Sequence, residues 1–163
     1  MIQSKIFAGF ILRRGARGHA SNNPAVNRAT VVLFNDETSR SSLLVWGFRS
    51  DTLASSTINM VQQKGNVAGQ TAGVVDPYYT GDPKPPGAIG ALETTSLITP
   101  DFVFDPARAN TFWEAGIPLA VIDPGCALIF QAGANALAMG ISLVWDWRVS
   151  DELAYTFPLE PTA

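Results

Sequence analysis

The last third of the chain contains a strict alternation of side chains that suits only an extended strand. From residue 141 to residue 148, large apolar residues alternate with smaller or polar ones: Ile141, Leu143, Trp145 and Trp147 against Ser142, Val144, Asp146 and Arg148. Successive side chains of a β-strand point to opposite faces, so a period of two places the four apolar side chains together on one face. We expect residues 137–149 to form a half-buried strand.

Several other short runs of β-branched and aromatic residues predict further strands. These runs lie at 30–34, 43–48, 57–63, 92–98, 102–104, 117–122 and 127–131. Residues 2–12 suit a strand, although their apolar spacing also suits a helix. Residues 17–27 read as turn material, and Asp105 followed by Pro106 predicts one turn of helix within 105–113.

The chain contains 14 glycines and 11 prolines. These residues interrupt regular structure too often for a bundle of helices. Five of the glycines and four of the prolines fall within residues 68–90, which predicts a long ordered loop there. Many short strands with frequent turns and almost no helix indicate an all-β protein. We expect an antiparallel β-sandwich, with a jelly roll as the leading topology.

The length of 163 residues corresponds to one domain. We expect residues 1–150 to form a single sandwich. Residues 151–163 contain two prolines and are expected to form an extended C-terminal arm that packs on the domain or reaches a neighbour.

The charge distribution favours assembly with other subunits. Residues 1–50 carry seven Lys or Arg and two acids, a balance of +5, whereas residues 51–163 carry four against twelve, a balance of −8, which together give the net −3. Charged residues make up only 15% of the chain, so much of its surface is neutral or apolar. This distribution suits head-to-tail packing of identical subunits or docking on a partner of opposite charge, and it disfavours uniform coating of a nucleic acid.

The single cysteine, Cys126, makes an intrachain disulfide impossible and favours folding in a reducing compartment. Polar residues interrupt the first twelve positions, and no apolar run approaches the length of a membrane span. We therefore expect a chain that is made in the cytoplasm and does not enter a membrane.

The residues needed for common catalytic and metal sites are scarce. His19 is the only histidine and lies in a Gly/Arg-rich stretch, and together with Cys126 it does not complete a zinc ligand set. No Gly-x-Ser-x-Gly elbow, dinucleotide fingerprint, P-loop or calcium loop occurs. A pair of carboxylates across a cleft stays open as a hydrolase alternative. We expect no catalytic residues, no metal and no cofactor.

Candidate contact residues come instead from the basic cluster Arg13, Arg14 and Arg17 and from the 68–90 segment. That segment offers rigid aromatic contact area at Tyr78 and Tyr79 and stiff proline-rich backbone at Pro83, Pro85 and Pro86. The arginines suit a solvated turn, an ion-pair contact with an acidic neighbouring subunit, or phosphate binding. We predict these eight residues as an interface.

The stretch from Phe112 to Val149 resembles small structural proteins of tailed-phage virions. It contains the apolar run I-P-L-A-V-I, the turn D-P-G, a second apolar run ending at Gln131, and a strand closing in W-D-W-R. The resemblance implies the end of a β-sandwich in a virion subunit, without catalytic residues. It suggests a capsid decoration or cement protein, or a tail component, located in the virion.

These observations together predict a homo-oligomeric structural subunit that contacts the major capsid protein or tail proteins. Its loops would bury apolar and aromatic surface against its neighbours. A carbohydrate- or receptor-binding module on the same fold is the alternative. It would use Trp46 or Trp113 with acids from the loops.

Overall fold

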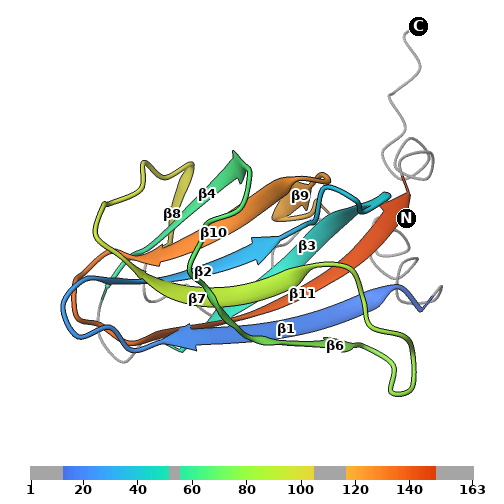
Figure 1. The fold of residues 1–163 in the computed structure, drawn as a ribbon, viewed down its shortest axis with the longest axis horizontal. Helices are drawn as coiled ribbons and strands as arrows, with labels where there is room; N and C mark the ends of the chain where they lie inside the picture. The colour runs from blue at the N-terminus through green and yellow to red at the C-terminus, as the bar shows by residue number, and fades with distance from the viewer. Residues whose placement is uncertain (1–12, 52–55, 105–116, 150–163) are drawn as a thin grey trace, which may run out of the picture.

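The computed structural model describes residues 13–51, 56–104 and 117–149. Within these ranges the chain forms only β-strands, joined by turns and loops, and no helix. The strands are β1 (Gly15–Asn22), β2 (Arg28–Phe34), β3 (Ser41–Ser50), β4 (Ile58–Lys64), β5 (Thr71–Ala72), β6 (Val74–Pro77), β7 (Ala88–Thr94), β8 (Phe102–Phe104), β9 (Ala120–Ile122), β10 (Cys126–Ala132) and β11 (Met139–Val149). Figure 1 shows their arrangement.

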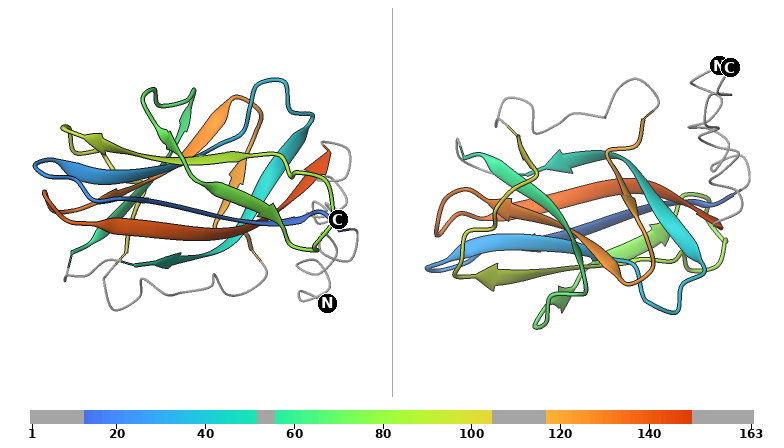
Figure 2. Two further views of the ribbon diagram at one scale, coloured as in Figure 1. Left: turned by 60° about the horizontal axis from the view of Figure 1, so that its bottom comes forward. Right: turned by 90° about the horizontal axis from the view of Figure 1, so that it is seen from above.

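The strands form two sheets, in which every pair of neighbouring strands is antiparallel. The first sheet has the order β6-β1-β11-β3-β9, and the second has the order β5-β7-β2-β10-β4-β8. The sheets pack face to face, as the two views of Figure 2 show. The prediction of an all-β antiparallel sandwich is therefore confirmed.

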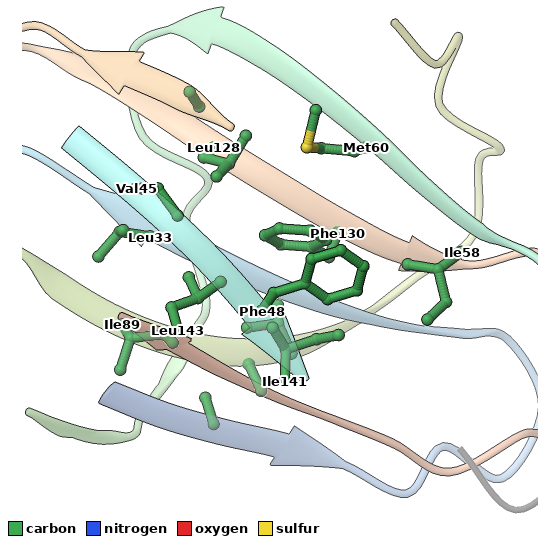
Figure 3. Packing of buried hydrophobic residues seen from close by; sticks show 14 of the residues in the cluster. Leu33, Val45, Phe48, Ile58, Met60, Ile89, Leu128, Phe130, Ile141 and Leu143 are labelled. Carbon is green, nitrogen blue, oxygen red and sulfur yellow. The ribbon is translucent and has the colours of Figure 1, made fainter. Parts of the chain in front are cut away.

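The core lies between the inner faces of the two sheets. Leu33, Phe130, Ile141 and Leu143 are fully buried there, and Figure 3 shows how they interdigitate with their neighbours. The Phe48 ring lies 4.6 Å from Phe104 and 5.3 Å from Phe130, between ring centroids. Such aromatic contacts add to the burial of apolar area, which is the main stabilising contribution to a sandwich of this kind.

The alternation that predicted the last strand is present in β11. Ile141, Leu143 and Trp145 point into the core and are completely buried. The pairing of β11 with β3 shifts by one residue, because Val144 faces Gly47 whereas Trp145 faces Val45. Trp46 is the extra residue of this β-bulge, which increases the local twist of β3.

Two predictions about irregular segments need revision. The prediction of turn structure is wrong for residues 17–22, which belong to β1 and pair with both β11 and β6. The single long loop predicted at 68–90 is not confirmed, because β5, β6 and the start of β7 lie within it. The predicted elements at 2–12, 105–113 and 151–163 fall outside the described residues.

The segment that carries β5 and β6 passes from one sheet to the other. Thr71 and Ala72 pair with β7 of the second sheet, and from Val74 onward the chain pairs with β1 of the first sheet. Gly73 lies at the crossing, where its N–H donates to the carbonyl oxygen of Ile89 at 2.8 Å. This edge of the sandwich is thereby closed by backbone pairing.

Candidate functional site

The loop between β6 and β7, residues 78–87, lies at the end of the sandwich where β1 begins (Figure 1). The Tyr78 N–H donates to the carbonyl oxygen of Gly15 at 2.8 Å, which ties the start of the loop to β1. At the other end of the loop, the buried Trp145 donates its indole N–H to the carbonyl oxygen of Pro86 at 3.1 Å. Both ends of the loop are thus held by hydrogen bonds to the sandwich.

Arg13 makes a two-point ion pair within this region. Its Nη2 lies 2.7 Å from Oδ1 of Asp82, and its Nε donates to Oδ2 of the same carboxylate at 2.9 Å. The hydrogen bond and the charge of Asp82 raise the pKa of Arg13 above its ordinary value. The guanidinium carbon also lies 4.9 Å from the centre of the Tyr79 ring, a cation–π geometry.

Arg17 lies on β1, two residues into the strand, where its partner on β6 is Asp76. Its guanidinium carbon is 6.0 Å from the centre of the Tyr78 ring. The Tyr78 and Tyr79 rings meet edge to face with their centroids 5.6 Å apart. The four side chains therefore form one continuous cluster, in which the two arginines flank the pair of tyrosines.

We call Arg13, Arg17, Tyr78 and Tyr79 the arginine–tyrosine surface. The tyrosines expose 48% and 37% of their area, which is high for large aromatic residues. Because Asp76 and Asp82 accompany the two arginines, the surface carries little net charge. It offers flat aromatic area surrounded by hydrogen-bond donors, a composition suited to contact with a partner.

The other predicted interface residues differ from one another in how far they are exposed. Arg14 is half-buried, and its carbonyl oxygen accepts a hydrogen bond from the N–H of Trp147 at 3.3 Å. Pro83 is exposed beside the tyrosines, whereas Pro86 is half-buried. Pro85 is buried in the single chain, so it does not present an exposed side chain there. This second half of the loop anchors it to the core instead of facing outward.

Asp82 is the residue that sequence reasoning missed. It lies 69 positions from Arg13, and no local pattern links the two. The contrast between a basic first third and an acidic remainder was the available signal, and the sequence interpretation assigned it to contacts between subunits. Part of that complementarity is satisfied within the chain.

The other residues considered as reactive or ligand-binding groups do not form a site in the described part of the chain. Cys126 is half-buried and packs against the core cluster. Trp46 is only 5% exposed, so it offers no free face to a sugar, and Trp113 lies outside the described residues. Among the residues placed by the structure, no three His, Cys, Asp or Glu side chains gather as a metal site. Nor does this part of the chain contain a helix that is long and apolar enough to cross a membrane.

The chain matches no protein-family model, no curated protein and no solved structure. A function can therefore be inferred only from the arrangement and chemistry of the described residues. The arginine–tyrosine surface is the arrangement that best fits the predicted interface.

Proposed function

We propose that this protein is a structural subunit of a tailed-phage virion, of the capsid decoration or cement type. It would form a homo-oligomer and contact the major capsid protein. The observation that carries this proposal is the arginine–tyrosine surface, in which exposed aromatic rings contact one another and two arginines at one end of a sandwich. Tyrosine side chains lose little conformational entropy on binding, and both tyrosine and arginine are enriched in the energetically dominant parts of interfaces.

The strand order supports a jelly-roll topology for this subunit. If β5, β6 and β7 are set aside, the sheets read β1-β11-β3-β9 and β2-β10-β4-β8. This is the order obtained when eight strands labelled B to I are wound as two Greek keys, with B-I-D-G facing C-H-E-F. The three remaining strands are an insertion between the fourth and fifth strands, and they extend both sheets at the same edge.

The insertion is also the part of the chain that creates the candidate contact surface. It places β6 beside β1 and then continues into the loop with Tyr78 and Tyr79. A contact between this edge and a different part of a second copy would be heterologous, and such contacts form rings when the rotation closes. A ring is the assembly expected of a subunit that lines a symmetric position on a capsid.

The proposal is tested by substituting both tyrosines with serine, Tyr78→Ser and Tyr79→Ser together. We expect analytical ultracentrifugation to show weaker self-association, and co-sedimentation with tailed-phage particles to fall at least about tenfold, while the melting temperature of the monomer is unchanged. Leu97→Ser is the matched control, because Leu97 is an exposed apolar residue outside the surface. Equal assembly and particle binding by the double variant and the parent would overturn this role.

A further inference from the structure

A shallow groove of about 330 Å³, to which several polar residues contribute, lies on the outer face of the first sheet. Its lining comes from the end of β1 and the turn after it, from the residue after β3, and from the start of β11: His19, Ser21, Asn22, Asn23, Asp51, Ala138, Met139 and Gly140. A second hollow of about 260 Å³ continues on the other side of His19 toward Arg17 and Asp76.

Gly140 is one of the residues that line the groove. On the outer face, Ser21 of β1 is the partner of Gly140 of β11, and the N–H of Asp51 donates to the carbonyl oxygen of Gly140 at 2.9 Å. A Cβ on Gly140 would lie 3.1 Å from Cε1 of His19 and 3.4 Å from Cβ of Ser21. The neighbouring side chains therefore already lie close to Gly140, and a side chain at this position would crowd them.

The neighbouring row of the sheet is also polar, and its residue His19 lines the groove. His19, Ser142 and Arg49 are register partners across β1, β11 and β3. The Nδ1 atom of His19 lies 2.9 Å from Oγ of Ser142, which orients the imidazole ring. Arg49 lies next to Asp51, with Nε 3.7 Å from Oδ1.

The lining of the groove fits a ligand with many hydrogen-bonding groups. It combines a carboxylate, two side-chain amides, one hydroxyl group and an imidazole, which together offer hydrogen-bond donors and acceptors. The charge of Asp51 is opposed by Arg49, which leaves no excess of positive charge for an anion. A ligand with many hydroxyl groups satisfies both donors and acceptors.

We propose that this groove binds a neutral saccharide. The site differs from the tryptophan-based sugar site considered from the sequence, and it does not depend on the proposed virion role. The groove lies beside the arginine–tyrosine surface, because Arg17 and His19 are two residues apart on the exposed face of β1 and both line the second hollow. Docking and saccharide binding would therefore use neighbouring parts of the same face.

The test begins with the full chain on a glycan array that carries neutral and acidic oligosaccharides. We expect binding to neutral glycans, with a Kd of about 1 mM for a single chain. The neutral glycan with the strongest signal is then titrated into isotopically labelled protein and followed by NMR. The largest shift changes should involve the backbone amides of Ser21, Asp51 and Gly140.

Two variants locate the site. Ser21→Trp fills the hollow above Gly140, and Asp51→Asn removes a charged acceptor; each should weaken binding at least about tenfold. Glu37→Gln is the matched control, since it alters an exposed carboxylate in the turn between β2 and β3. The proposal is overturned if no neutral glycan binds, if only acidic glycans bind, or if both groove variants bind as strongly as the control.

Discussion

At the scale of single residues, glycines decide where backbones can approach. Gly73 lies where the chain crosses between the sheets, and a Cβ there would press against the carbonyl oxygen of His19 and lie 2.8 Å from Cβ of Ala20. Neither neighbour is the end of a flexible side chain, so the backbone itself would have to move. The contacts at Gly140 are less severe, because the nearest atom to a Cβ there would be Cε1 of His19 at 3.1 Å.

Gly73→Ala should therefore destabilise the fold by about 3 kcal/mol, the upper part of the range for overpacked substitutions. The expected observation is a lower midpoint of urea unfolding with an unchanged slope. Thr71→Ala is the control, since Thr71 is exposed on the same segment. A Gly73→Ala protein as stable as this control would show that β6 is not closely seated on β1.

At the scale of elements, the outer face of the second sheet is covered by the segment between β7 and β8, and one buried side chain holds that segment. Nε2 of Gln131 donates to Oγ1 of Thr94 at 2.7 Å and to the carbonyl oxygen of Ser96 at 2.8 Å. Its Oε1 accepts from the N–H of Ile98 at 3.0 Å. The Gln131 amide replaces the strand partner that this segment lacks.

Gln131→Ala should lower the free energy of unfolding by about 2 kcal/mol, because the backbone groups of Ser96 and Ile98 lose their partners. Hydrogen exchange of the Ile98 amide should accelerate more than that of amides within β10. Gln63→Ala provides the comparison, since Gln63 is an exposed glutamine on the adjacent strand β4. Equal effects of the two substitutions would contradict an anchoring role for Gln131.

Element by element, local patterns predicted strands well where one face is buried. The alternation of β11 and the apolar run of β10 depend on neighbours two residues apart, and both strands formed. β1 was mistaken for turn material because its inward-facing residues, Ala16, Gly18 and Ala20, are small and do not form a large apolar pattern. Its conformation comes from pairing with β11 and β6, whose residues are far away in the sequence.

At the scale of the whole molecule, an ion pair is buried on the outer face of the first sheet. Asp146 is fully buried, and its Oδ2 accepts from Nη2 of Arg148 at 3.0 Å. Burial raises the pKa of Asp146 above its ordinary value of 3.8, although the charge of Arg148 acts in the opposite direction. Desolvation thus exceeds the attraction within the pair.

The raised pKa has a defined consequence for stability. The folded protein holds the Asp146 proton more tightly than the unfolded chain does, so the protonated carboxyl group stabilises the fold. This stabilisation is fully present below pH 3.8 and is lost as the pH rises through the raised pKa. Asp36 acts in the opposite sense, because hydrogen bonds from Thr38 lower its pKa and its contribution is lost as the pH falls. Carboxylates with lowered pKa values make a protein more stable as the pH rises from acidic values, and Asp146 acts against this trend.

Asp146→Asn should remove this decline. We expect the free energy of unfolding of the variant, measured by urea titration over a pH series that begins near 3.8, to fall less with rising pH than that of the parent. The absolute stability of the variant is lower, because Arg148 loses its charged partner. Glu37→Gln is the control for removal of an exposed carboxylate, and identical pH slopes for Asp146→Asn and the parent would contradict the assignment.

The sequence alone determined that this chain is built from strands in an antiparallel sandwich, because alternation and turn residues act between close neighbours. It also singled out Arg13, Arg17, Tyr78 and Tyr79 as candidate contact residues. Only the tertiary structure decided that these four meet, that Asp82 pairs with Arg13, and that Ser21, Asp51 and Gly140 line a groove beside His19. These features depend on strand register across tens of residues, and register is set by the simultaneous burial of both sheets.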